Sequence, residues 1–451
     1  MSWRVRAVHI LAAGLLALCI VAPPRAGAQP ARSPASGASP LAAELDKLAA
    51  AVEPELLEWR RYLHQHPELS NRETETAKYV TERLKSFGLE PKTGVARTGV
   101  VAILKGGKPG PVVALRTDMD GLPVREEVDV PFASKASSKY EGQDVGVMHA
   151  CGHDAHMAIM LATARVLTKL QDRLPGTVKF IFQPAEEGAP LAERPAGAQL
   201  MVSEGVLKDP NVDAIFGLHV FANVPSGHVT WRSGSFMAAS DTFEIAVKGR
   251  QTHGSQPWNG VDPVVVGSQI VTALQTIVSR SVDITRAPAV VTVGQFQSGV
   301  RFNIIPDSAR LVGTIRTFDE KVQADIHARI KRIAEGIASG AGATVEVKIT
   351  KNTPVTSNDA ALTARMLPTL ERVAPGKVHE SELITGAEDY AFYQREVPGL
   401  FFFVGITPPA EVGRAAANHS PFFFVDESAL LTGVRSLTHL TVDYLFSPPA
   451  R

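Results

Sequence analysis

The sequence has very little cysteine, with only Cys19 and Cys151 among its 451 residues. Cys19 lies in an N-terminal apolar stretch that we expect to be removed, so the mature chain would keep a single thiol. One thiol excludes an internal disulfide, and with it the small disulfide-stapled scaffolds of exported proteins. A lone thiol in an oxidising compartment is a liability unless it is buried or occupied. Ligation of a metal would occupy it.

The sequence also lacks an excess of either charge, since 46 Lys and Arg residues balance 46 Asp and Glu residues. No basic stripe is evident, which argues against nucleic acid and anionic membrane surfaces as partners. No long hydrophobic run follows the N-terminal segment, so we expect no membrane-spanning helix there. The apolar content of 45% is ordinary for a globular enzyme.

The N-terminal residues have the pattern of a secretory signal. Two arginines precede an apolar core at residues 9–21, and a small-residue cleavage pattern follows at residues 26–28. The apolar core is short for a bilayer span, which favours a cleavable signal over a retained anchor. We predict a signal peptide at residues 1–28, a flexible leader rich in Pro, Ala and Ser at residues 29–40, and a secreted or periplasmic location.

Residues 41–239 alternate predicted helices with short apolar strands. The spacing of leucines predicts helices between residues 41 and 88, and a long helix is expected at residues 155–174. Four short, largely apolar runs predict buried strands, at residues 100–104, 112–116, 178–182 and 213–220. Buried strands separated by helices are typical of an α/β layer architecture.

The pattern changes near Ser240, where apolar and polar residues begin to alternate strictly. Six elements are expected in the order strand, helix, strand, strand, helix, strand, at residues 242–249, 262–280, 289–297, 309–318, 321–339 and 344–350. This order predicts a compact βαββαβ unit with its own two layers. We therefore predict one α/β domain, formed by residues 41–239 and 351–447, that is interrupted by a smaller domain at residues 240–350.

The segment VMHACGHDAHMA, residues 147–158, places the remaining cysteine among histidines. Cys151 and His153 lie two residues apart at a predicted strand-to-helix transition. A thiolate and an imidazole that close together can bind one borderline-soft cation. Alone this signal is weak, because a Cys-Gly-His triplet arises by chance and lone histidines are usually structural.

Ligand-type side chains also follow other predicted strands. Glu186 and Glu187 come directly after a strand in FQPAEEG, and His219 ends the next one in GLHV. Ligands gather at the carboxyl ends of strands in α/β sheets. One glutamate could bind a metal while the other acts as a general base on the attacking water. From these residues alone, surface charge and a hydrogen-bonded core histidine stay open as alternatives.

Two more segments supply candidates of the same kind. Asp118 and Asp120 follow a strand in ALRTDMDG, and His419 precedes an aromatic patch in NHSPFFF. Several separate segments thus each supply side chains that bind metals. Their combination predicts a metal site where any one of them would not.

Taken in order, these motifs resemble the amidohydrolase branch of the co-catalytic metallopeptidases, which contains aminoacylases, hippurate hydrolases and indole-acetyl-amino-acid hydrolases. The resemblance is carried by RTDMDGLPV, HACGHDAH, FQPAEEG, GLHV, TGAEDYAFY and NHSPFF, and by the opening helix signature RRYLHQHPELS. It extends from Leu41 to Phe446. It implies a mixed-sheet α/β metallohydrolase domain with an inserted ferredoxin-like domain that serves as lid and dimerisation surface.

The resemblance implies two divalent metal ions per subunit, with zinc or manganese favoured and cobalt or nickel as alternatives. Five residues match the protein ligands: Cys151, His153, Glu187, His219 and His419. Cys151 matches the ligand that touches both ions, whose charge would hold the thiol as thiolate. Some relatives have a ligating histidine where this chain has Arg116, so Arg116 is not counted as a ligand.

Catalytic roles follow from the same resemblance. Glu186 matches the general base, and Asp118 matches the carboxylate that orients a ligating histidine. His253, in GRQTHGSQP, resembles a histidine that reaches across a dimer into the partner's site. The implied enzyme is therefore a homodimer that pairs through its lid domain.

Substrate binding is implied at three positions. Asn303 and Arg316 match residues that bind a substrate carboxylate, for which a guanidinium fork is well suited. Gly386 lies in TGAEDY, where Ala387 departs from the glycine or serine of many relatives. A proline-bearing loop within residues 186–202 lies beside the site and leaves the size of the pocket open.

The implied reaction is metal-dependent hydrolysis of the amide bond of N-acyl amino acids, small molecules with a free carboxylate. A metallo-exopeptidase, either a dipeptidase or a carboxypeptidase, is the first alternative, because it also releases an amine that bears a carboxylate. A hydrolase with Cys151 as nucleophile is the second alternative, although it would leave the glutamate pair and His419 without a role. A non-catalytic binding protein is a third, and it would not need an intact general base.

Overall fold

The computed structural model describes residues 37–448. The predicted signal peptide and most of the predicted leader lie outside these residues, so the location of the protein stays a prediction. None of the described helices has the length and apolarity that a bilayer crossing requires.

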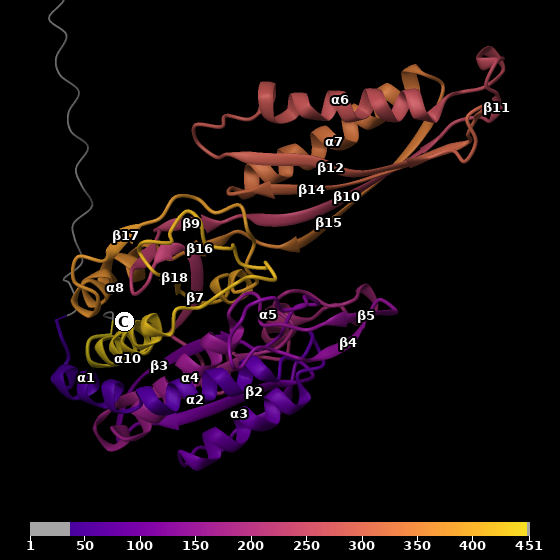
Figure 1. The fold of residues 1–451 in the computed structure, drawn as a ribbon. Coiled ribbons are helices and arrows are strands. Elements are labelled where there is room, and N and C mark those ends of the chain that lie inside the picture. The colour runs from indigo at the N-terminus through magenta and orange to yellow at the C-terminus, as the bar shows by residue number, and fades with distance from the viewer. Residues whose placement is uncertain (1–36, 449–451) are drawn as a thin grey trace, which may run out of the picture.

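An eight-stranded mixed sheet forms the centre of the larger part of the molecule, in the order β1-β2-β6-β3-β7-β18-β8-β17 (Figure 1). Its strands are β1 (Lys92–Val95), β2 (Gly99–Lys105), β3 (Lys108–Asp118), β6 (Pro175–Gln183), β7 (Ala214–Pro225), β8 (Val229–Trp231), β17 (Val378–Glu380) and β18 (Gly399–Thr407). The four central strands β6, β3, β7 and β18 are parallel. Their carboxyl ends therefore share one edge of the sheet, as the sequence predicts.

Helices cover both faces of this sheet. The first face carries α1 (Ala42–Ala51), α2 (Glu53–Gln65), α3 (Thr74–Ser86), α4 (His153–Thr168), α8 (Ala360–Val373) and α10 (Leu430–Phe446). The second carries the short helices α5 (Gly197–Ser203) and α9 (Ala391–Gln394). Strand β18 is buried along its whole length, because its alternate residues enter the two apolar layers. This arrangement confirms the predicted α/β fold with a mixed sheet.

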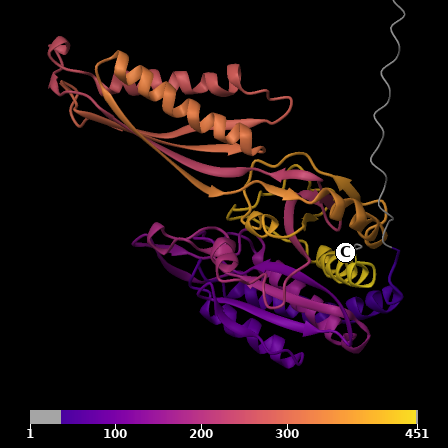
Figure 2. The same cartoon turned by 180° about the vertical axis from the view of Figure 1, so that it is seen from behind.

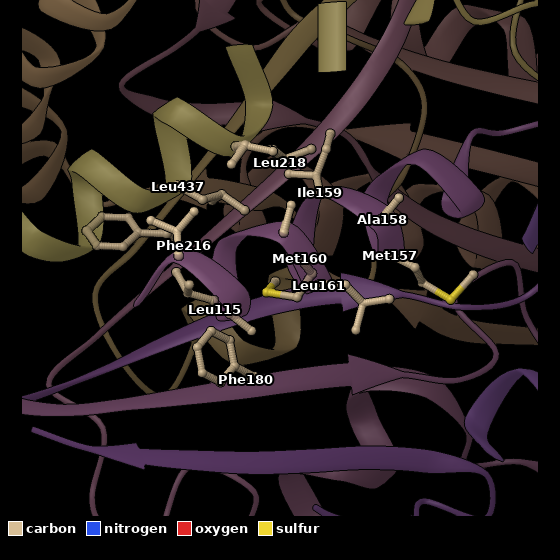
Figure 3. Packing of buried hydrophobic residues seen from close by; sticks show 14 of the residues in the cluster. Leu115, Met157, Ala158, Ile159, Met160, Leu161, Phe180, Phe216, Leu218 and Leu437 are labelled. Carbon is tan, nitrogen blue, oxygen red and sulfur yellow. The ribbon is translucent and has the colours of Figure 1, made fainter. Parts of the chain in front are cut away.

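Helix α4 is the centre of the first layer. It is apolar on almost every side, a composition typical of a fully buried helix. Figure 3 shows its residues Met157 to Leu161 between side chains of the sheet, such as Leu115 and Phe216, and Leu437 of α10. Tight packing on all sides fixes the position of the first turn of α4, where the cysteine-histidine motif lies.

A second, four-stranded antiparallel sheet has the order β12-β14-β10-β15 and its own apolar core. It consists of β10 (Ala239–Lys248), α6 (Pro263–Ser281), β12 (Ala289–Ser298), β14 (Ser308–Thr317), α7 (Glu320–Gly340) and β15 (Thr344–Thr353). Asp262 and Asp319 cap the two helices by accepting hydrogen bonds from their first backbone N–H groups. Both helices cover the same face (Figures 1 and 2).

Strands β10 and β15 run from this unit back to the larger part of the molecule, so both connections lie side by side (Figure 2). The predicted boundary at residue 350 falls inside β15, which continues to Thr353. The remaining strands form small pairs: β4 (Ser137–Tyr140) with β5 (Gln143–Gly146), β9 (Gly234–Met237) with β16 (Thr356–Asn358), and β11 (Thr252–His253) with β13 (Ile304–Ile305).

Candidate metal centre

The five predicted metal ligands come from separate segments that meet at the carboxyl edge of the parallel strands. Cys151 lies in the turn before α4, and His153 is the first residue of that helix. Glu187 follows β6, His219 lies in β7, and His419 lies in the loop between β18 and α10. The fold thus brings together residues up to 268 positions apart.

The donor atoms of these residues form two overlapping groups. Those of Cys151, His153 and His219 lie within 4.8 Å of one another, and so do those of Cys151, Glu187 and His419. Cys151 Sγ lies 3.3 Å from His219 Nε2 and 3.2 Å from His419 Nε2. The thiol therefore lies between the two groups, as a ligand shared by two cations would.

Two unusual backbone conformations shape this cluster. Gly152 has φ 90°, and a Cβ at this position would lie 2.2 Å from Val220 Cγ2. Only glycine fits this left-handed turn between Cys151 and His153. His419 has φ 73° without being glycine, and its backbone N–H is held by the carbonyl of Ala150. Strain of this kind persists where the surroundings impose it, often at functional sites.

Two imidazoles of the cluster have ring nitrogens available to bind a cation. His219 Nδ1 donates to the backbone carbonyl of Val220 at 2.7 Å, which leaves the Nε2 lone pair facing Cys151. His153 Nε2 is buried without a hydrogen-bond partner among the described residues, 3.9 Å from a carboxylate oxygen of Glu187. A buried orphan nitrogen is costly unless something binds it. The donor set therefore fits a metal, and the backbone contact of His219 is typical of a ligating histidine.

The charges of the cluster also favour cations. Burial raises the pKa of the Cys151 thiol well above its usual range, and the nearby carboxylates of Glu187 and Glu186 raise it further. Burial lowers the pKa of His153, but Asp118 and Asp120 overcome this effect and raise it to about 10. Without a cation, both the thiol and the imidazole thus hold a proton. Divalent ions would replace these protons and balance the carboxylates.

Glu186, the predicted general base, lies beside the ligand groups. Its carboxylate is within 4.0 Å of His153 Nε2, and its Oε1 accepts a 3.4 Å contact from the backbone N–H of Asp389. Burial raises its pKa well above the usual value, and Glu388 and Glu187 add to this while Arg116 opposes it. A carboxyl group with a raised pKa is suited to proton transfer near neutral pH.

Arg116 is fully buried and pairs with carboxylates instead of joining the ligands. Its guanidinium lies 2.7 Å from Asp118 Oδ2, 2.9 Å from Glu388 Oε1 and 2.9 Å from Asp389 Oδ1. The Nε of Arg116 donates to Gln183 Oε1 at 2.8 Å. Arg116 therefore balances the acidic groups behind Glu186 and holds the loop at residues 386–390 in place.

Asp118, the predicted orienting carboxylate, forms its short histidine contact with His156. Asp118 Oδ1 accepts a 2.6 Å hydrogen bond from His156 Nδ1, whereas the predicted ligand His153 is 3.9 Å away. His156 in turn accepts from the backbone N–H of Val220 at 2.8 Å. The carboxylate nearer to His153 is Asp120, with Oδ1 3.3 Å from Nδ1. The sequence places both aspartates at one strand end and does not distinguish their partners.

A pocket of about 530 Å³ opens onto the cluster. Besides the metal-binding candidates, it is lined by the predicted substrate residues Arg316 and Gly386 and by apolar side chains such as Phe221 and Phe403. Arg316 Nη1 donates to Ser240 Oγ at 2.7 Å. The structure therefore places Arg316 on the second sheet and the metal-binding candidates on the first around one cavity.

His253 and Asn303 do not reach this pocket in their own chain. His253 lies in β11 at the far end of the smaller unit, where it is exposed and contacts Ser255 Oγ at 2.7 Å (Figure 1). Asn303 lies beside it, since its carbonyl accepts a hydrogen bond from the backbone N–H of Gly254. His253 and Asn303 therefore lie close to each other but not close to Glu186 of the same chain.

A thiol lies between two groups of side chains that can bind metals, and a carboxylate that can accept a proton lies next to them. This arrangement is typical of a metal-dependent hydrolase. That is the class which the fold and the site define. The match of residues 114–443 to the model of peptidase family M20/M25/M40 makes the assignment specific, and the chain belongs to this family.

Curated relatives span nearly the whole chain. It is 40% identical over 398 residues to thermostable carboxypeptidase 2 of Saccharolobus solfataricus, covering 88% of this chain and 96% of the relative. It is 39% identical over 388 residues to N-acetylcysteine deacetylase of Bacillus subtilis, covering 86% of this chain and 96% of that protein. It is 36% identical over 407 residues to IAA-amino acid hydrolase ILR1-like 2 of Arabidopsis thaliana, covering 88% of each chain.

A solved structure agrees with this assignment. The chain is similar to the YXEP protein of Bacillus subtilis, described as a dinuclear metal binding peptidase from the M20 family, with a TM-score of 0.74 and 36% identity. The match covers 88% of this chain and 99% of that protein. The chain is thus a metal-dependent hydrolase of its family, as the sequence predicts.

Proposed function

We propose that the chain hydrolyses the amide bond of N-acyl amino acids, with Glu186 as general base beside two divalent cations. The observation that carries this proposal is the position of Cys151 Sγ between His219 and His419, next to the glutamate pair. The five ligands would be Cys151, His153, Glu187, His219 and His419. Relatives named as a deacetylase of N-acetylcysteine and a hydrolase of IAA-amino acids support the substrate class.

The cations, when bound, would polarise the substrate carbonyl and make the attacking water more acidic. The remaining work falls to side chains of this chain. Glu186 accepts the proton of the water and passes it to the leaving amine. The backbone N–H of Asp389 holds one oxygen of Glu186 and so orients the other. Arg316 binds the carboxylate of the substrate, and Gly386 lies in the adjoining loop of the pocket.

We propose zinc or manganese as the physiological ions, with cobalt or nickel as alternatives. A thiolate with imidazoles suits zinc, whereas carboxylates also accept manganese, so metal availability can decide between them. Adding each ion to chelated protein, with activity and bound metal measured together, tests this choice.

The smaller unit has the order expected of a ferredoxin-like lid, and we propose that it also pairs two subunits. It exposes apolar side chains on α6 and at its far end, among them Val265, Trp258 and Phe302. In such a dimer His253 and Asn303 would complete the partner's site. Mixing inactive Glu186→Gln subunits with inactive His253→Ala subunits should then restore activity, because hybrid dimers contain one complete site. No recovery in verified hybrid dimers would contradict this proposal.

A metallo-exopeptidase is the second candidate, because a carboxypeptidase is among the similar proteins. A panel of N-acetyl, N-benzoyl and long-chain N-acyl amino acids, assayed beside dipeptides, distinguishes the two. Faster hydrolysis of dipeptides would replace the proposed function with the second one.

A thiol hydrolase is disfavoured by the surroundings of Cys151. A nucleophilic thiol needs a lowered pKa, whereas burial and carboxylates raise the pKa of this one. EDTA should therefore abolish activity, and added divalent cations should restore it. Activity that survives complete metal removal would support the thiol mechanism instead.

The secreted or periplasmic location also belongs to this proposal and depends on the predicted signal peptide at residues 1–28. N-terminal sequencing of protein exported by a bacterial host tests it. Cleavage after residue 28 is the expected result.

A further inference from the structure

Arg194 is a second arginine at the rim of the site pocket, and the sequence motifs gave it no role. It lies on the proline-bearing loop between β6 and α5, seven positions after Glu187. Its Nε donates to the carbonyl of Ala189 at 3.4 Å, and its Nη1 donates to Asn352 Oδ1 at 3.0 Å. The second contact ties the loop to the smaller sheet across the pocket.

A bulge in β15 presents Asn352 to this arginine. On strand β10 Ser240 faces Thr353 and Asp241 faces Lys351, so Asn352 is an extra residue without a partner on β10. A β-bulge changes the direction in which the side chain of its extra residue points. The amide of Asn352 donates to Thr242 Oγ1 at 2.9 Å, which turns its oxygen toward Arg194.

The side chains of Arg194 and Arg316 both contact the smaller sheet where it lines the pocket. Ser240 pairs with Arg316 of β14 on one side and with Thr353 of β15 on the other. Neighbouring strands are ~4.8 Å apart, so the backbones of Arg316 and Thr353 are separated by about 10 Å. Arg194 meets β15 at the residue next to Thr353. The two guanidiniums therefore flank one short row of hydroxyl side chains that lines the pocket.

Neither arginine forms an ion pair among the described residues; the charge of Asp241 acts on Arg316, but this carboxylate accepts its hydrogen bonds from Gln323 and His327. Arg194 contacts only a carbonyl and an amide oxygen, and Arg316 contacts Ser240, Thr314 and a backbone carbonyl. Within residues 37–448 no carboxylate forms an ion pair with either of them. Adjacent acids are engaged elsewhere: Glu193 pairs with Arg72, and the acids of the loop after Gly386 pair with the buried arginine of β3. Two unpaired guanidiniums in one pocket match a ligand with two carboxylates.

We propose, building on the function proposed above, that the preferred substrates release an acidic amino acid. Arg316 binds the α-carboxylate of N-acyl-glutamate or N-acyl-aspartate, and Arg194 binds its side-chain carboxylate. A neutral side chain of the same shape leaves Arg194 without this partner. The chain thus selects N-acylated acidic amino acids over their amide counterparts.

The test compares N-acetyl-glutamate with N-acetyl-glutamine on the metal-reconstituted protein. A charge-assisted hydrogen bond predicts a kcat/KM about 10- to 100-fold higher for the glutamate substrate. Arg194→Gln should reduce this ratio to near one. The matched control is Arg97→Gln, which removes an arginine that contacts Pro195 of the same loop from outside the pocket, and it should keep the ratio.

Three results would overturn the proposal: equal rates for the two substrates, equal loss of the ratio in both variants, or a preference for N-succinyl-alanine over N-acetyl-glutamate. The last result would place Arg194 at the acyl group. Calorimetric binding of both N-acetyl compounds to metal-loaded Glu186→Gln protein gives a readout that needs no turnover. Selective binding without hydrolysis in the wild type would refute the proposed function alone, whereas hydrolysis without selectivity would refute only this inference.

Discussion

Replacing Arg116 by methionine should strongly destabilise the metal-free protein. The guanidinium is fully buried and lies within 3 Å of three carboxylates, those of Asp118, Glu388 and Asp389. Removing one partner of a buried ion pair costs about 3–5 kcal/mol, because an uncompensated charge is left behind. Asp118 and Asp389 are the acids that carry charge at pH 7, so two carboxylates lose their buried cation and we expect a loss within this range. Methionine keeps much of the volume, which limits any contribution from a cavity.

Urea unfolding of the metal-free Arg116→Met protein at pH 7, followed by fluorescence and circular dichroism, measures this loss. Arg310→Met is the matched control: it removes an exposed pair with Glu244 and should leave the midpoint nearly unchanged. Adding Asp118→Asn to the first variant should recover part of the stability, because Asp118, whose pKa lies well below its usual value, is the carboxylate that remains charged at pH 7. A free energy of unfolding within about 1 kcal/mol of wild type would refute the balancing role of Arg116.

Three further changes test other parts of the site. Glu186→Gln should lower kcat by about 10²- to 10⁴-fold with unchanged metal content, and loss of the metal with the activity would contradict its role as base. Gly152→Ala should lower the free energy of unfolding by about 2–5 kcal/mol and reduce the amount of bound metal, because the new Cβ meets Val220 in a left-handed turn. A variant with the melting temperature and metal content of the wild type would refute this. In the presence of EDTA, the melting temperature of the protein should decrease as the pH is raised from 6.5 to 8. Burial raises the pKa of Glu73 to about 7 and of Glu388 to about 8, so the folded state binds protons there that the unfolded state has lost. A flat or rising profile would contradict this.

The elements that the sequence predicts well are those with a strong local pattern. The runs at residues 178–182 and 213–220 are largely apolar because β6 and β7 are buried on both faces over these residues, and both strands form as expected. The βαββαβ order also forms, since its strands alternate and its helices begin at capping aspartates. Short strand pairs such as β9 with β16 depend on contacts between distant segments, so no local sequence pattern predicts them.

The site divides in the same way. Ligand-type residues at strand ends are visible in the sequence because topology alone brings strand ends to one edge. Arg194 could not be found this way, because its position depends on a bulge at Asn352 in another sheet. Which histidine Asp118 and Asp120 each approach depends on side-chain directions within one strand end. Only the packed structure determines those directions.

The central claim is that distant segments hold two cations around Cys151, and the metal content of active protein tests it most directly. Elemental analysis should find two divalent transition-metal ions per subunit, and activity should follow the added equivalents. Cys151→Ser should lower the affinity for both ions, because its sulfur lies between the two donor groups. Full activity in protein that contains no transition metal would contradict the account.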